Sequence, residues 1–163
     1  MFLAVHATAG ALLGSVSANP AISFSAGFLS HFLLDMIPHG DQYLYEQYKR
    51  GDKKRRAIVQ VSVDVLATGL LVLTLLSSVS FRFEAGAIAG MIGGLLPDLL
   101  VGVFELLKPK GRRWTGRQLK RFSDLHMRNH VFLIRRIFGG DLSSKFGLAM
   151  QVLVIGLVLK WML

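Results

Sequence analysis

Cysteine is absent from this sequence. Its absence excludes a disulfide framework, a thiolate zinc site and a cysteine nucleophile. Any metal ligands must therefore be the nitrogen and oxygen atoms of other side chains, chiefly His, Asp and Glu. The sequence also has no Walker phosphate loop and no Gly-x-Ser-x-Gly nucleophile elbow, so these two signatures of nucleotide binding and of serine hydrolysis are missing.

Charge is sparse and mostly of one sign. Only 18% of the residues are charged, and 10 acidic residues stand against 19 Lys and Arg, for a net charge of +9. Hydrophobic residues make up 52% of the chain, and its mean hydropathy is +0.49. This composition is unusual for a soluble domain of this length and is typical of a membrane protein.

Five apolar segments are candidates for membrane-spanning helices, which need about 20 residues each. The first two are short, and we expect them to pair as a hairpin across the break at Asn19-Pro20. A cleaved signal peptide explains the first segment less well, because its first residues carry no basic side chain. The predicted fold class is all-α: a polytopic membrane helical bundle that forms a single membrane domain over residues 1–163. The segments cover about residues 3–17, 21–38, 57–79, 84–106 and 147–163.

Basic residues gather in two blocks between these segments, within 49–56 and 108–121. Five spans place both blocks on one side of the membrane. The positive-inside rule makes that side, and with it the N-terminus, cytoplasmic. Because the charges flank the spans, the expected partners are the lipid bilayer and anionic lipids, and not nucleic acid.

A basic amphipathic helix is predicted over about residues 117–138, in the cytoplasmic interface. Four arginines fall on one face of this helix. His126 and His130 fall on the apolar face, where they could act as part of a lid that adds imidazoles to a site in the bundle. An alternative is that these histidines only form hydrogen bonds in the interface. The apolar face carries Leu119, Phe122, His126, His130, Leu133 and Ile137.

Ionisable residues inside the apolar segments are costly and usually functional. At about 1.5 Å of helical rise per residue, all of them lie within roughly 12 Å of the same membrane face. Imidazole and carboxylate groups are ligands for divalent cations. The sequence therefore predicts a buried metal site, against the alternatives that these side chains only join helices or that Asp64 pairs with a nearby arginine. The residues are His6, His31, Asp35, Asp64 and Asp98.

One short segment concentrates this chemistry. His31, Asp35 and His39 are spaced four residues apart and are expected to line one stripe of a helix. Pro38 lacks an amide proton, so the helix should kink or end there and turn His39 and Asp41 toward the site. A second proline beside an acid, in Leu-Pro-Asp at positions 96–98, predicts a similar distortion of the fourth span.

The segments Ser30–Asp35 (SHFLLD) and Leu95–Asp98 (LLPD), with the early His6, carry a family resemblance. They resemble the Ser-His-x-Leu-Leu-Asp, Leu-Pro-Asp and N-terminal His motifs of the bacterial membrane-bound metal-dependent hydrolases of the YdjM type. That family is described as distantly related to zinc-dependent phospholipases C. The resemblance implies phosphoester hydrolysis at a metal cluster in the bacterial inner membrane, with ligand roles for His6, His31, Asp35 and Asp98.

These observations predict a membrane-embedded hydrolase that uses a divalent metal, with zinc as first choice and manganese or iron as alternatives. The expected substrate is a phosphoester of a lipid or isoprenoid phosphate at the cytoplasmic leaflet, with Asp41 or His130 as general base. The alternatives are a metal or proton transporter and a non-catalytic membrane interaction protein. A homo-oligomer is also an open prediction, through the small-residue stripe of Gly86, Gly90 and Gly94. The predicted metal ligands are His6, His31, Asp35, His39, Asp64, Asp98 and His126.

Overall fold

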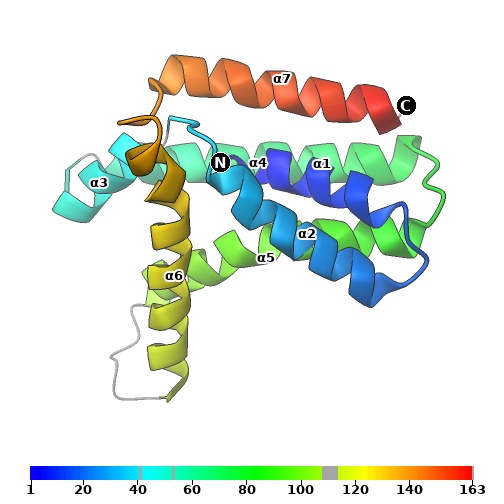
Figure 1. The fold of residues 1–163 in the computed structure, drawn as a ribbon, viewed down its shortest axis with the longest axis horizontal. Coiled ribbons are helices and arrows are strands. Elements are labelled where there is room, and N and C mark those ends of the chain that lie inside the picture. The colour runs from blue at the N-terminus through cyan, green and yellow to red at the C-terminus, as the bar shows by residue number, and fades with distance from the viewer. Residues whose placement is uncertain (41, 53, 108–113, 163) are drawn as a thin grey trace.

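The computed structural model describes residues 1–40, 42–52, 54–107 and 114–162. Within these residues the chain folds into seven helices, which confirms the predicted all-α class. The helices α1, α2, α4, α5 and α7 form a bundle, and α6 crosses one end of it (Figure 1). The helices are α1 (Leu3–Gly14), α2 (Pro20–Asp35), α3 (Gln42–Arg50), α4 (Lys54–Ser78), α5 (Glu84–Leu107), α6 (Trp114–Arg136) and α7 (Ser144–Met162).

Three described helices, α4, α5 and α7, are long and apolar enough to cross a membrane. This number is consistent with membrane association but is smaller than the five predicted spans. The difference lies in α1 and α2, which have only 12 and 16 residues, against the roughly 17–25 that a span needs. Both end about three residues before the apolar pattern does. For α2 the reason is local, since Pro38 disfavours helical backbone at Ile37.

The bundle core consists of α1, α2 and α5, which pack closely against one another. Glycine makes this approach feasible. A Cβ atom at Gly90 would overlap the carbonyl oxygen of Gly10, and one at Gly27 would overlap the carbonyl oxygen of Gly90. The stripe predicted as a dimer face, to which Gly90 belongs, is therefore buried inside the chain against α1 and α2.

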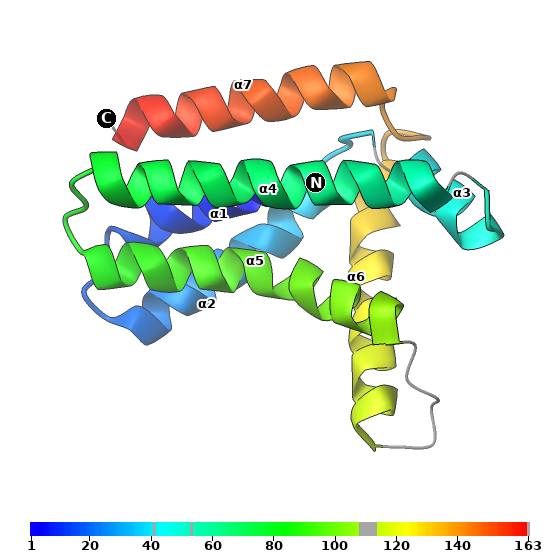
Figure 2. The same ribbon diagram turned by 180° about the vertical axis from the view of Figure 1, so that it is seen from behind.

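Outside this core, α4 and α7 each pack against α1. Both helices expose most of their leucine and valine side chains, as Leu66 at 69% and Leu153 at 61% illustrate. The view from behind shows α4 and α7 along the outer side of the bundle (Figure 2). These outward faces are suited to lipid.

The helix α6 is amphipathic, as predicted, but begins three residues earlier and ends two residues earlier than expected. Its buried side includes Ser123, His126, His130 and Ile134. Ile137, which was expected on the apolar face, follows the end of the helix and is 65% exposed. The short helix α3 was not predicted, because its nine residues are too few for a clear apolar period.

One end of the bundle collects the polar segments. The beginnings of α1, α4 and α7, the ends of α2 and α5, and the helices α3 and α6 all lie there (Figures 1 and 2). The predicted common depth of the ionisable residues agrees with this arrangement, because each of them lies in the half of its helix that is nearer to that end.

Candidate metal centre

All five histidines of the chain are buried, with exposed fractions between 0% and 8%. Isolated buried imidazoles are unusual, and their convergence at one end of a helical bundle marks a site. Two groups of potential metal ligands lie within it. The first contains His31, Asp35, Asp98 and His126, and we call it the four-residue cluster.

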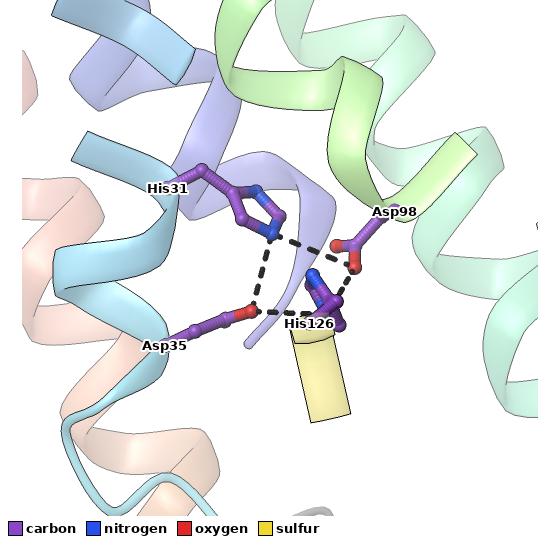
Figure 3. Close-up of side chains that lie close together, drawn as sticks. All are labelled: His31, Asp35, Asp98 and His126. Atoms are coloured by element: carbon purple, nitrogen blue, oxygen red, sulfur yellow. Dashed lines mark ion pairs between the residues drawn. The ribbon is translucent and has the colours of Figure 1, made fainter. Parts of the chain in front are cut away.

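Three helices supply the four-residue cluster. His31 and Asp35 are one turn apart on α2, Asp98 comes from α5, and His126 comes from α6. In Figure 3 the ion-pair lines join these side chains in a closed ring. His31 Nε2 lies 3.1 Å from Asp35 Oδ2 and 3.7 Å from Asp98 Oδ1. His126 Nε2 lies 3.4 Å from each of the same two oxygens.

These spacings fit one four-coordinate metal ion. Zinc binds imidazole nitrogen and carboxylate oxygen at about 2.0–2.2 Å, so neighbouring ligand atoms lie about 3.3–3.5 Å apart around one ion. The four ring distances of the cluster, from 3.1 to 3.7 Å, bracket that spacing. The cluster could thus hold a divalent ion with little rearrangement.

Hydrogen bonding prepares His31 for this role. Its Nδ1 lies 2.8 Å from the carbonyl oxygen of Gly94, and a carbonyl can only accept, so Nδ1 carries the proton. When the ring is neutral, Nε2 presents a lone pair. That nitrogen and Asp35 Oδ2 are both fully buried, 3.1 Å apart, and neither has a hydrogen-bond partner among the described residues. A proton on Nε2 or a metal ion between the two atoms would satisfy both of them.

His126 is also in its metal-binding form. The ring is 2% exposed, and this burial lowers the pKa of His126 to about 3. The imidazole is therefore neutral at pH 7, as a metal ligand must be.

His6, a predicted ligand, lies beside the cluster and holds its carboxylates. Its Nε2 is 3.1 Å from Asp35 Oδ1 and 4.0 Å from Asp98 Oδ2, the two oxygens that point away from the ring of contacts. The Met1 amino group lies 3.0 Å from the same Asp35 Oδ1. These contacts orient the carboxylates in the way that outer partners of metal ligands do.

The second group contains Asp35, His39 and His130. His39 does not lie on the predicted helical stripe, because α2 ends at Asp35. The chain instead turns back through Pro38 and Gly40 and brings His39 to this group. Gly40 has φ of +86°, a conformation that favours glycine. The stripe was therefore wrong, although the structure brings His39 to Asp35. Asp41, predicted as a general base, lies outside the described residues.

Asp64 lies at the predicted depth but outside both groups. Its Oδ2 accepts a hydrogen bond of 2.9 Å from the amide of Leu3, and its Oδ1 accepts one of 3.3 Å from Thr68 Oγ1. Leu3 begins α1, whose N-cap residue Phe2 offers no side-chain acceptor. Asp64 therefore caps α1 from a neighbouring helix.

Two supporting residues were not predicted. The carboxylate of Asp141 accepts hydrogen bonds of 2.8–3.0 Å from the amides of His39, Gly40, Gln42 and Leu142. Gln151 on α7 accepts from the Phe2 amide and donates to the carbonyl oxygen of His39. A lone glutamine within an apolar span was a usable signal for Gln151. Asp141 offered none, because three of its partners lie about 100 residues away.

Comparison with known protein families, curated proteins and solved structures finds no match to this chain. Function must therefore be inferred from the chemistry of the site.

Proposed function

We propose that this chain is a membrane-embedded, metal-dependent hydrolase that cleaves a phosphoester of a lipid or isoprenoid phosphate at the cytoplasmic leaflet. One observation carries the proposal. His31 Nε2 and Asp35 Oδ2 are buried, lack hydrogen-bond partners among the described residues, and face each other within a ring of ligand atoms at metal spacing. The motif resemblance to membrane-bound metal-dependent hydrolases supports the same activity.

The residues of the site would have separate roles in this reaction. His31, Asp35, Asp98 and His126 would hold a divalent ion, zinc first, with manganese or iron as alternatives. When bound, the ion would polarise a phosphoryl oxygen and acidify a water molecule. Asp98 is 26% exposed, whereas the other three are at most 2% exposed, so substrate would approach beside Asp98. Asp41 and His130 remain the predicted general bases.

The substrate class follows from where the cluster lies. It occupies the end of the bundle that α6 crosses, and α6 exposes bases such as Lys120 together with apolar side chains such as Leu125. Such a helix suits the membrane interface, where lipid phosphates lie. We further propose that α1 and α2 complete a five-segment bundle in the bacterial inner membrane, with the N-terminus cytoplasmic. Exposed leucines on α2, such as Leu29 and Leu33, support a membrane location for that helix.

A metal and activity assay with a matched pair of variants tests the proposal. We would purify wild type, Asp98→Asn and Asp124→Asn in detergent and measure bound metal by mass spectrometry. Each would then be incubated with mixed micelles that contain phosphatidic acid, phosphatidylglycerol or a polyprenyl phosphate. Asp124 is an exposed carboxylate on α6 that pairs with Lys120, so it controls for the loss of a charge.

We expect wild type and Asp124→Asn to retain metal and to release product from at least one of these lipids. Folded Asp98→Asn should lose both properties. A wild-type protein that takes up neither zinc nor manganese would contradict the proposal.

A non-catalytic metal protein is the second candidate, because a set of four protein ligands is typical of structural zinc sites. In that case the metal would be retained and no phosphoester would be cleaved. Removing the metal would instead lower the unfolding temperature.

A further inference from the structure

The group Asp35, His39 and His130 lies directly beside the four-residue cluster and shares Asp35 with it. One ligand atom from each of its residues lies within 4.8 Å of the others. The three side chains are buried, with exposed fractions of 1%, 1% and 8%. His130 is one helical turn from His126 on α6, and the centroids of these two rings are 6.1 Å apart. Two ligand groups therefore adjoin across one shared carboxylate.

The protonation of His39 directs its lone pair into this group. His39 Nδ1 lies 2.6 Å from the carbonyl oxygen of Ile37, so Nδ1 must be the donor. In the neutral ring Nε2 then carries a lone pair, and it lies 3.1 Å from His130 Nε2. Two nitrogens at this distance either share a proton or bind one metal ion, whose ligand atoms are about 3.3 Å apart.

Hydrogen bonds fix the backbone of His39, as is expected for a residue that positions a metal ligand. Asp141 accepts its amide proton at 3.0 Å, and Gln151 donates to its carbonyl oxygen at 3.2 Å. Gly147 on α7 has no side chain to separate the helix from that carbonyl. Contacts from two other parts of the chain thus position one imidazole.

The charges around the two groups bear on when a second cation could bind. Among the described residues, the carboxylates of the two groups are those of Asp35 and Asp98, and their two negative charges balance a single divalent ion. The Met1 amino group adds one positive charge beside Asp35. Two carboxylates, one amino group and one divalent ion sum to a charge of +1, so a second divalent ion would need an anionic ligand such as a phosphate to offset its charge.

We propose that Asp35, His39 and His130 form a second divalent-metal site, so that Asp35 bridges two ions. The inference rests on the proposed function for its first ion and deepens it. Two-metal sites hold their ions about 3.5–4 Å apart and serve in-line displacement at phosphorus by binding both the attacking and the leaving oxygen. His130 thereby becomes a ligand, in place of the general base predicted from the sequence.

Manganese binding tests this site separately from the first. We would strip the detergent-purified full chain with chelator, reload it with Mn²⁺, remove excess ion, and measure bound manganese per protein and its electron paramagnetic resonance spectrum. Wild type should bind two equivalents and show the spectrum of an exchange-coupled pair. His39→Ala and His130→Ala should each lose one equivalent and give an uncoupled signal. Asp124→Asn, a surface change on α6, should behave like wild type.

The outcomes separate the two proposals. One equivalent in wild type, uncoupled and unchanged in His130→Ala, would overturn the second site while leaving the first. No bound manganese or zinc would overturn both. Size-exclusion chromatography checks that the variants are folded. If neither histidine variant folds, the wild-type spectrum alone distinguishes a coupled pair of ions from a single ion.

Discussion

The inner helices α1, α2 and α5 and the outer helices α4 and α7 are similarly apolar in sequence but meet different surroundings. Within the apolar window of α5, 39% of the residues are buried inside the chain, against 11% for α4 and for α7. The inner helices carry glycines at their contacts and hold His6, His31, Asp35 and Asp98. The outer helices present leucine and valine outward. Hydropathy measures both kinds equally, so it identifies a membrane helix without telling lipid contact from protein contact.

The inner and outer helices should differ most in how an added methyl group changes the stability of the protein. Gly90→Ala on α5 should prevent folding or cost more than about 3 kcal/mol, because its Cβ would overlap backbone atoms of α1. Gly69→Ala on α4 meets no described atom within 4 Å and should stabilise the helix by about 0.5–1 kcal/mol. Unfolding in detergent with a denaturing surfactant measures both. Equal effects would show that the two helices do not differ as described.

The buried His126 of α6 should make the stability of the protein depend on pH. The pKa of His126 is lowered by burial from its ordinary 6.5 to about 3 in the folded chain, so below pH 6.5 the unfolded chain binds the proton more readily. In metal-free protein this residue should therefore remove about 1.4 kcal/mol of stability per pH unit as the pH falls from 6.5 toward 3. His126→Gln should flatten that slope. Chelator-treated samples unfolded at several pH values provide the measurement, and identical slopes would contradict the assignment.

A smaller effect is expected where the loop of His39 is held. Asp141→Ala removes the acceptor of the amides of His39, Gly40 and Gln42. Manganese should bind about 10- to 100-fold more weakly at the second site, as is usual when the support of a ligand is lost. Binding at the four-residue cluster should change little. Titration beside Asp124→Ala measures this, and equal weakening at both sites would indicate general loss of structure.

The smallest effect should come from the outward-facing side of α4. Leu66 is 69% exposed, so Leu66→Ala should change the free energy of unfolding in detergent by less than about 0.5 kcal/mol. Leu75 on the same helix is 2% exposed and packs near Ala11 and Met91, so Leu75→Ala should cost about 2–5 kcal/mol. Similar values for the two would mean that α4 has no distinct outer face.

Much of the candidate site was predictable because membrane helices restrict depth. His31, Asp35 and Asp98 stand out as charges within apolar runs, and His126 stands out on the apolar face of a basic helix. Asp64 shows the limit of that inference. It has the expected depth, but it lies on α4, outside the core, and caps α1. The depth of a residue along its own helix follows from the local sequence. The direction in which its side chain points within the bundle depends on how the helices pack.

His39 and Asp141 show the same limit in a loop. The four-residue spacing from Asp35 to His39 indicated a continued helix, but Pro38 ended the regular backbone, and the contact survives through the turn at Gly40. Asp141, about 100 residues away in sequence, accepts hydrogen bonds from that turn. No local sequence pattern indicates this contact. Likewise, the glycine stripe on α5 indicated close packing correctly but not its partner, which is α1 and α2 of the same chain.

The sequence by itself determined the helical class, the apolar segments, the donor chemistry of the site and the end of the bundle where its residues gather. These properties follow from composition, apolar period and helical rise, each of which acts over a few residues. Only the tertiary structure decided which ionisable side chains share a ligand group, which one caps a helix, and which helices expose their apolar faces. Those outcomes depend on close packing between segments distant in sequence, where a single glycine contact sets which helix faces meet.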